Sequence, residues 1–471
     1  MINYKELDFK CGLEVHYQLS TRKLFCHCPN LPNDPNPILF RTVRKLRAFE
    51  GELGKKDLAA EFEESKNKSF IYEGTAASSC LVDFDEAPPY QLNEGTLKIA
   101  LQVALLLNMK IVDEIIVMRK LVIDGSNPTG FQRSCLIGRN GFLLTSKGKI
   151  AIPTLYLEED AAKKISSDGT SVTYNLSRLG IPLLEIATAP DLQDPEHVKE
   201  TASLIGTVVQ STSSVNHGIG SVRQDVNISI KNHKRIELKG FQDLRSIPKV
   251  IEIEIQRQLN TKNEESHVRK VEEDFTTTYL RPMPGSSRLY PETDIPTIPV
   301  TSNFLKSVEI PELITERALN FEKKYNISAQ YAREIIKENI PFDYYAEKYK
   351  IDPKFIAHAL LELPKELKSR FQIKKEPKKE HFDFIFSNIE KNNIPKEAAI
   401  DIIKELINGI KPDLSKHAAI SLDELEEFIK KLVRENKGVS IGGLMGDIMK
   451  KYKGSVEGSL VMKILKKYYK K

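Results

Sequence analysis

Acidic and imidazole side chains recur at alternate positions in three short segments that have the periodicity of β-strands. Glu14 and His16 are two residues apart in the first segment, Asp225 and Asn227 in the second, and Glu237 lies in the third. Side chains two residues apart in a strand project from the same face. Several oxygen donors and one imidazole suit a hard cation such as Mg²⁺, so these residues are candidate metal ligands.

Two further acids, Glu158 and Glu159, follow an apolar segment and extend the set of candidate ligands and catalytic groups. Acids on the outer face of a strand are most often only solvated. The sequence also has no Walker-type phosphate loop and no GxGxxG after a strand. None of these spacings therefore establishes a site by itself.

The five cysteines are too few and too scattered for a disulfide framework. Cys26, Cys28 and Cys80 could contribute to a zinc site, with Cys11 or His27 as a fourth ligand. CxC is not the common CxxC spacing, and three thiolates leave a tetrahedral site one ligand short. Ordinary intracellular cysteines are the simpler interpretation.

The elements that would position these residues are strands and amphipathic helices. Alternation predicts strands over 13–19, 222–230 and 236–239, each with one apolar and one polar face. Helical spacing predicts a helix over 94–108, and Asp194 with Pro195 marks the start of another. The buried stripes of the two helices would be Leu97, Ala100, Leu101, Ala104, Leu107, and Val198, Ala202, Ile205, Val209.

A chain of 471 residues exceeds what one core usually supports. We predict an α+β domain with an antiparallel sheet over 1–300, a helical linker domain over 301–373, and a helical tail domain over 381–471. The charged stretch 374–380, with a central proline, is typical of an exposed linker. No apolar run is long enough to span a membrane and the N-terminus lacks a signal pattern, so a cytoplasmic location is expected.

The net charge of +5 is too small to indicate a nucleic-acid partner, but its distribution is uneven. Nine lysines stand against two acids between Lys437 and Lys471. A surface of this kind would attract a phosphate backbone, although a solvated helix end has the same composition. The candidate nucleic-acid contacts are Lys450, Lys451, Lys453, Lys463, Lys466 and Lys467.

Six motifs follow one another along the chain: Gly12–His16, Leu24–Pro29, Leu157–Ala162, Arg178–Ile186, Arg223–Asn227 and Glu237–Gly240. In this order they resemble the B and E subunits of tRNA-dependent amidotransferases. Other segments resemble the E type more than the B type, namely Cys80–Val82, Ile123–Asn127, Phe131–Arg133 and Arg281–Pro284. E subunits usually carry an inserted domain similar to one in bacterial aspartyl-tRNA synthetases. Only Asn260 to Leu280 stand at its place here, so a B-type subunit with A and C partners is the alternative.

The resemblance implies a cradle domain similar to the glutamine synthetase and guanido kinase catalytic domains, followed by helical domains that contact tRNA. It implies that ATP phosphorylates the side-chain carboxyl of glutamate on tRNA(Gln) and that ammonia converts it to glutamine. Mg²⁺ would be held by Glu14, His16, Glu159 and Glu237, with Glu158, Asp225 and Asn227 nearby. Arg119, Lys120, Arg133 and Arg223 are candidates to stabilise the transferring group.

The chain has no nucleophile-elbow serine or other hydrolase signature, so the ammonia source is expected in a partner. For an E-type subunit that partner is an asparaginase-like D subunit, in a heterodimer or heterotetramer. A glutamine-synthetase-like ligase acting on a free amino acid is a rival interpretation, but it leaves the basic tail without a use. A non-catalytic tRNA-binding scaffold is a second rival, and the intact acidic set argues against it.

Overall fold

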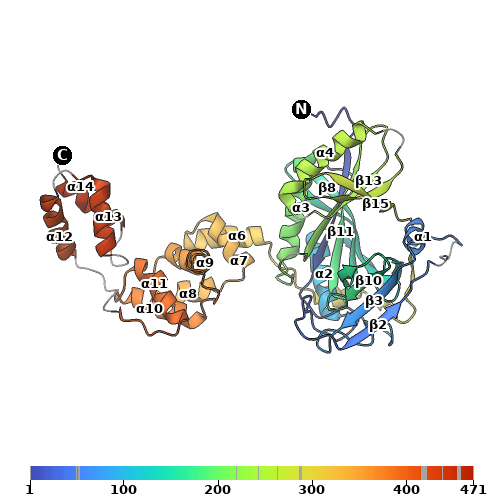
Figure 1. Ribbon diagram of the computed structural model, residues 1–471, viewed down its shortest axis with the longest axis horizontal. Helices are drawn as coiled ribbons and strands as arrows, with labels where there is room; N and C mark the ends of the chain where they lie inside the picture. The colour runs from blue at the N-terminus through green and yellow to red at the C-terminus, as the bar shows by residue number, and fades with distance from the viewer. Residues whose placement is uncertain are drawn as a thin grey trace. The chain divides into compact units, whose positions relative to one another are not determined.

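The computed structural model describes residues 2–48, 50, 54–218, 220–241, 243–261, 264–285, 289–414, 422–436, 439–452 and 458–469. The chain divides into two compact units, Met1–Leu313 and Ile314–Lys471, and each is described by itself (Figure 1). Among the described residues, no helix combines the length and the apolar character that crossing a bilayer requires.

The N-terminal unit is built on one large sheet (Figure 1). The strand order is β15-β14-β13-β12-β1-β11-β8-β7-β6-β16, and β4 pairs with β7. The strands are β1 (Lys10–Gln18), β4 (Lys110–Ile111), β6 (Val117–Leu121), β7 (Phe131–Thr145), β8 (Gly148–Glu159), β11 (Pro182–Ala187), β12 (Val222–Ser229), β13 (Ile236–Lys239), β14 (His267–Val271), β15 (Thr277–Pro282) and β16 (Leu289–Pro291). The described pairs of this sheet are antiparallel except β13 with β14, which a helical crossover connects.

Three helices pack against this sheet, namely α2 (Glu94–Leu106), α3 (Pro195–Gln210) and α4 (Ile247–Leu259), the last after a short 3₁₀ turn, η1 (Leu244–Ser246). Helix α3 begins as predicted, because Asp194 accepts a hydrogen bond from the backbone N–H of His197 at 3.0 Å. Both predicted stripes are buried in the core between helices and sheet. Each large aliphatic side chain buried there contributes about 1.5–3 kcal/mol.

Alternation along the central strands gives the sheet two different faces. Leu13, Val15 and Tyr17 of β1 are buried in the helix-covered core, whereas Glu14 and His16 are only partly buried. Strands β12 and β13 send their apolar residues into the same core. The three predicted strands and their polar faces are therefore confirmed. Strand β1 begins at Lys10 instead of residue 13, and the other bounds agree to within one residue.

Smaller elements flank the large sheet. A second sheet has the order β2 (Phe40–Arg44), β3 (Ser69–Gly74), β10 (Ser171–Asn175) and β9 (Lys163–Ser167), and α1 (Leu58–Ser65) precedes β3. β5 (Glu114–Ile115) pairs with β17 (Ile298–Pro299), and α5 (Ser302–Lys306) follows. The second sheet has its own small core, to which Tyr72 and Tyr174 contribute stacked rings.

The described part of the C-terminal unit is helical. The helices are α6 (Ile314–Tyr325), α7 (Ala329–Lys337), α8 (Phe342–Lys348), α9 (Pro353–Arg370), α10 (Lys379–Glu390), η2 (Lys396–Ala398), α11 (Ala399–Ile407), α12 (Leu422–Glu435), α13 (Ile441–Lys451) and α14 (Gly458–Tyr468). One apolar cluster joins α6 to α11, and a second joins α12 to α14. The first cluster includes residues on both sides of the exposed stretch 374–380.

The coarse architecture agrees with the sequence prediction, because a mixed α+β unit with a large sheet precedes helical domains. The finer division into 1–300, 301–373 and 381–471 stays a prediction. The structure itself places the boundary between its two units at Leu313 and Ile314.

Candidate active site

A cavity of about 1370 Å³ lies over the polar face of the large sheet. Strands β1, β6, β8, β11, β12 and β13 each contribute at least one charged side chain to its wall. Residues of α1 and of the segment 281–284 also line it. Small-molecule pockets usually have roughly 300–1,000 Å³, so this cavity has room for more than one ligand.

Three neighbouring strands bring His16, Glu158 and Glu185 together, and we call these residues the His16 group. Their ligand atoms lie within 4.8 Å of one another. His16 is directly opposite Glu185 in the antiparallel pairing of β1 with β11, and its Nε2 is 3.3 Å from Glu185 Oε2. Lys120 Nζ donates to Glu158 Oε1 at 2.7 Å and to Glu185 Oε2 at 3.3 Å.

Charges within the His16 group stabilise one another. Burial opposes protonation of His16, but the hydrogen bond and negative charge of Glu185 outweigh it and raise the pKa of the imidazole. Burial also disfavours the charged form of Glu185, yet Lys120 and His16 hold the pKa of that carboxyl well below its usual value. Glu185 is thus an anion held by Lys120 and by the imidazole of His16.

Glu14, Asp225 and Glu237 form a second group, the Glu14 group, with ligand atoms also within 4.8 Å of one another. Glu14 and Asp225 are directly opposite each other in adjacent strands. Asn227 donates to Glu14 Oε1 at 3.4 Å, and Lys239 Nζ lies 2.5 Å from Asp225 Oδ2 and 2.6 Å from Glu237 Oε1. Burial and the nearby carboxylates raise the pKa of Glu14 to about 7.

Arg223 completes the charged wall of the cavity. Its guanidinium donates to Asp160 Oδ1 at 2.7 Å, and Asp160 is itself buried. Arg223 retains 37% exposure of its side chain, so it faces the space in which a ligand would lie. Lys120 and Arg223 are the two predicted basic residues that the structure places at the cavity.

The structure does not bring Glu159, Arg119 and Arg133 to this cavity. They form a separate network around Glu292, a buried residue of the segment that follows β16. Arg133 Nε donates to Glu292 at 2.8 Å, Arg119 reaches the same carboxylate at 2.5 Å, and Arg133 Nη1 is 3.5 Å from Glu159. Each of the three is adjacent in sequence to a cavity residue, and strand alternation sends it to the other face.

Glu185 and Lys239 line the cavity but were not selected from the sequence. A feature of the sequence could have identified each residue. Glu185 is the one charged residue in the strand Pro182–Ala187, and Lys239 is two residues from Glu237. A carboxylate in a strand that is otherwise apolar is costly unless it is paired. The two groups offer oxygen donors and an imidazole beside cationic side chains, a set that can hold divalent cations and phosphate groups together.

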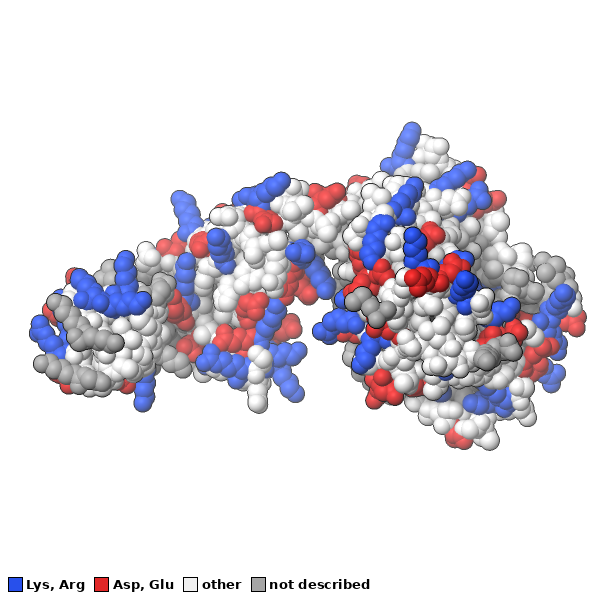
Figure 2. Space-filling model, turned by 90° about the horizontal axis from the view of Figure 1, so that it is seen from above, with Lys and Arg blue, Asp and Glu red and all other residues white. Residues whose placement is uncertain are grey.

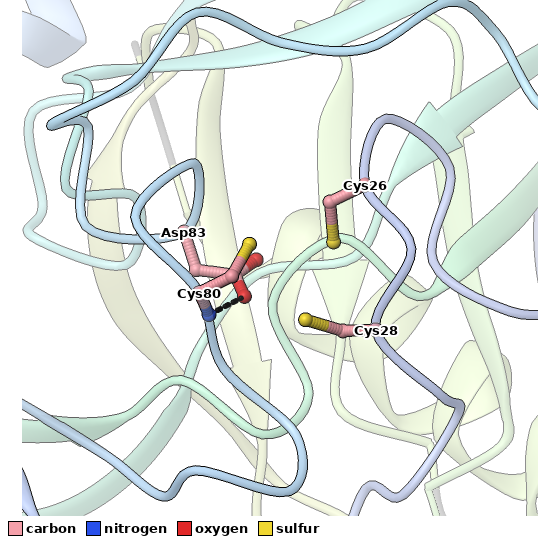
Figure 3. A group of neighbouring side chains, drawn as sticks. All are labelled: Cys26, Cys28, Cys80 and Asp83. Carbon is pink, nitrogen blue, oxygen red and sulfur yellow. Dashed lines mark hydrogen bonds between the residues drawn. The ribbon is translucent and has the colours of Figure 1, made fainter.

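A third group of possible metal ligands lies outside the cavity and consists of Cys26, Cys28, Cys80 and Asp83 (Figure 3). Their sulfur and carboxylate atoms lie within 4.8 Å of one another, and Figure 3 shows the side chains of two loops pointing toward one another. Asp83 therefore supplies the fourth donor. Cys11 is buried in the large core, and His27 makes a tilted ring contact with Tyr90.

The surroundings of this cysteine group favour an anionic sulfur. Hydrogen bonds from the Cys26 and Cys28 thiols lower the pKa of Cys80. Lys23 is fully buried, and its Nζ donates to Asp83 Oδ2 at 3.0 Å and to the Leu176 carbonyl at 2.9 Å. The donor set is therefore pre-arranged, and it can bind a metal ion.

The predicted nucleic-acid contacts lie in α13 and α14. Lys450, Lys451, Lys463, Lys466 and Lys467 are exposed, whereas Lys453 lies outside the described residues. Lys467 is paired with Glu426 at 2.8 Å, and Lys451 lies over the Phe428 ring at 3.8 Å. Figure 2 shows basic side chains on the visible face of this helical end.

Comparisons with known proteins match both units. Residues 9–306 match the GatB/GatE catalytic domain, and residues 341–468 match the GatB domain. The E subunit of glutamyl-tRNA(Gln) amidotransferase from Methanosarcina barkeri is 33% identical over 99% of this chain and 98% of its own length. The E subunits from Methanocaldococcus jannaschii and Pyrobaculum islandicum are also 33% identical, covering 100% and 99% of this chain and 99% and 100% of their own lengths.

The relatives are longer than this chain. The alignment with the Methanosarcina barkeri protein runs over 623 positions, 152 more than the 471 residues here. At least 152 of those positions therefore have no residue in this chain, which agrees with the expected absence of an inserted domain.

Proposed function

This chain belongs to the GatB/GatE family, and from that premise we propose that the cavity on its large sheet is the site of transamidation. It is an E-type subunit of glutamyl-tRNA(Gln) amidotransferase, a glutamine-dependent ligase that transamidates misacylated Glu-tRNA(Gln). The observation that carries the assignment of the site is that the His16 group and the Glu14 group, whose donor atoms suit a metal ion, lie in one cavity with Lys120 and Arg223.

The reaction needs an activated carboxyl group, because a carboxylate is a poor electrophile. The family uses ATP for this purpose. Transfer of the γ-phosphoryl group to the glutamyl side chain gives an acyl phosphate and ADP. Ammonia then attacks the carbonyl carbon, phosphate leaves with the bonding electron pair, and a proton is lost to give the amide. The products are Gln-tRNA(Gln), ADP and phosphate, so the atoms balance.

The donor sets of the His16 group and the Glu14 group fit Mg²⁺, which prefers a few carboxylates together with phosphate oxygens. When bound, the ion neutralises phosphate charge and aligns the transfer. Within the pair Glu158 and Glu159, the cavity position of Glu158 supports Glu158 as the ligand. Asn227 holds Glu14 in place through its amide.

Lys120 and Arg223 are proposed to stabilise the negative charge of the transferring group. Lys120 is held by Glu158 and Glu185, and Arg223 is held by Asp160, so both cations are positioned before a ligand arrives. Arg119, Arg133 and Glu159 support the same strands from the opposite face through Glu292. Their role would be to fix the positions of β6, β7 and β8.

The N-terminal unit is proposed to share the cradle fold of glutamine synthetase and guanido kinase catalytic domains, with the antiparallel sheet as its floor. The partner that releases ammonia is proposed to be an asparaginase-like D-type subunit, in a heterodimer or heterotetramer. The tRNA-binding surface is proposed to include the exposed lysines of α13 and α14, because a phosphate backbone favours such a surface.

Zn²⁺ is the ion that we propose for the cysteine group. Three sulfurs and one carboxylate oxygen supply the four donors that a tetrahedral zinc site needs, and both atom types are zinc ligands. The group joins the loop after β1, which carries Cys26 and Cys28, to the loop after β3, which carries Cys80 and Asp83. A bound ion would supply a cross-link between those two loops.

Two variants in the Glu14 group test the proposed site. Glu14→Ala and Glu237→Ala should abolish conversion of radiolabelled Glu-tRNA(Gln) in the complex with the partner, while glutamine hydrolysis by the partner persists. Asp168→Asn, in an exposed turn of the second sheet, is the control that should convert Glu-tRNA(Gln) at the wild-type rate. Wild-type conversion by both Glu14→Ala and Glu237→Ala would overturn the assignment.

A further inference from the structure

Lys239 is the last residue of β13, and its ammonium lies among the carboxylates of the Glu14 group. Nζ is 2.5 Å from Asp225 Oδ2 and 2.6 Å from Glu237 Oε1. Two of the three carboxylates assigned above to a divalent ion are therefore engaged by a cation that belongs to the protein.

A lysine ammonium and a divalent ion compete for these oxygens. The ammonium has three donors and no lone pair, so it cannot become a ligand while it is protonated. Mg²⁺ requires its oxygen ligands at roughly 2.0–2.1 Å in a nearly ideal octahedron. An ion placed on Asp225 and Glu237 would stand a few ångströms from Nζ with a charge of the same sign. Each of the two cations therefore weakens the binding of the other at this group.

The Glu14 group is also the group that most needs a counter-ion. Its three ligands are carboxylates, whereas the His16 group contains an imidazole besides Glu158 and Glu185. Buried carboxylates that face one another are costly unless a cation neutralises them. Lys239 supplies that cation from the same strand, two residues after Glu237, and its side chain remains 29% exposed along the cavity wall.

We propose that Lys239 is the resident counter-ion of the Glu14 group and is exchanged for the divalent ion when the site is loaded. This inference rests on the proposed function. The exchange keeps the group neutralised in both states, and it turns the freed ammonium into the cavity. There Lys239 becomes available to the phosphate groups of the nucleotide. Metal loading thus prepares a phosphate-binding cation, which couples the two ligands of one reaction.

The first test measures metal affinity directly. Mn²⁺ binding is followed by the electron paramagnetic resonance signal of the free ion, in the absence of nucleotide and tRNA. Lys239→Met removes the competing charge but keeps the length of the side chain, so the affinity for Mn²⁺ should rise by on the order of tenfold. Weaker binding by Lys239→Met would overturn the exchange, because it would make Lys239 a support of the site.

Lys270→Met is the matched control for a general loss of positive charge. Lys270 is the register partner of Lys239 in the neighbouring strand β14, and it pairs with Glu272 instead of the Glu14 group. Lys270→Met should bind Mn²⁺ with an affinity close to that of the wild type. If the affinity for Mn²⁺ rose equally in both variants, the rise would come from the lower total positive charge and not from exchange at the Glu14 group. That result would also contradict the proposal.

The second test uses the unmodified sequence. Amine acetylation of the wild-type chain is followed at Lys239 and Lys270 by peptide mass spectrometry, with and without Mn²⁺. Exchange predicts that Mn²⁺ speeds the acetylation of Lys239 several-fold and leaves Lys270 unchanged. A constant rate at Lys239 when Mn²⁺ is saturating would overturn the exchange.

Glu237→Gln separates this inference from the proposed function. If Glu237→Gln binds as many Mn²⁺ ions per chain as the wild type, the proposed metal site itself fails. If Glu237→Gln loses bound Mn²⁺ but the ion does not change the reactivity of Lys239 in the wild type, the metal site stands and the exchange alone fails.

Discussion

Glu158 and Glu159 are consecutive residues of β8, yet their carboxylates belong to separate networks. Glu158 accepts hydrogen bonds at the cavity from Lys120 at 2.7 Å and Gln132 at 3.1 Å. Glu159 accepts one from the backbone N–H of Arg133 at 3.2 Å, in the network around Glu292. Successive side chains of a strand point to opposite faces of the sheet, so these two glutamates contact different residues although they are chemically identical.

Glu158→Gln should therefore lower the activity per folded molecule far more than Glu159→Gln does. The amide keeps the shape but loses the negative charge that holds Lys120 and would ligate a metal ion. We expect transamidation per folded molecule to fall by on the order of 10²-fold or more. Conversion of Glu-tRNA(Gln) and thermal unfolding are measured on the same preparation.

Glu159→Gln should leave the activity per folded molecule close to that of the wild type, because Glu159 lies beside Arg133 and does not line the cavity. Both variants remove a charge from a buried network, so their activities are compared per folded molecule. Activity per folded molecule should change much less than in Glu158→Gln. If Glu159→Gln were as inactive as Glu158→Gln at full stability, the separation of the two faces would be refuted.

Removal of metal from the cysteine group should loosen the two loops that it joins. Wild-type protein purified without chelator should contain about one zinc per chain, and Cys28→Ser should contain much less. Loss of the ion should raise the rate of proteolysis in the loop around Cys80. Cys135→Ser is the control, because Cys135 is buried in the large core and should not affect zinc content. A zinc-free wild type that resists proteolysis equally well would contradict this prediction.

Replacing the exposed lysines Lys450, Lys463 and Lys466 by glutamine should weaken tRNA binding and reduce its salt dependence. Each lost phosphate contact should lower the slope of log K against log salt by about 0.7–0.9. Filter binding at several salt concentrations provides the measurement. Lys374→Gln with Lys375→Gln, in the exposed stretch before α10, is the control of similar charge. If that pair changed the slope as much as the triple variant, the assignment to α13 and α14 would fail.

His197 should contribute a pH-dependent term to stability. It is fully buried in the first turn of α3, where Nδ1 accepts a hydrogen bond from the Gln193 N–H and Nε2 lies 2.8 Å from the Thr145 hydroxyl. Burial lowers the pKa of His197 below its usual 6.5, so the unfolded chain binds the proton more readily. The stabilising contribution is present above pH 6.5 and is lost as the pH falls toward the pKa of the folded state.

The comparison of wild type with His197→Gln isolates this term. Denaturant unfolding at pH 5 and at pH 8 should show a smaller free-energy difference between the two pH values in His197→Gln than in the wild type. If the free energy of unfolding changed between pH 5 and pH 8 by the same amount in the wild type and in His197→Gln, the pKa of His197 would be the same in the folded and unfolded chain.

Local patterns determined much of the fold. The cap Asp194 with Pro195, the apolar stripes of α2 and α3, and the two-faced β1 follow from interactions within a few residues, so their signals are complete in the sequence. The polar face of β1 also marked Glu14 and His16 as candidates. The family resemblance added the reaction, which neither charge nor spacing had specified.

Only the tertiary structure decided which candidates meet. Glu185 reaches His16 from 169 residues away, and Asp83 completes the cysteine group from a loop more than fifty residues after Cys26. Strand register decides such pairings, and a shift of one residue would exchange Glu158 for Glu159 at the cavity. Register depends on the packing of the whole sheet on its helices, so the site could not be completed from the local pattern of any single strand.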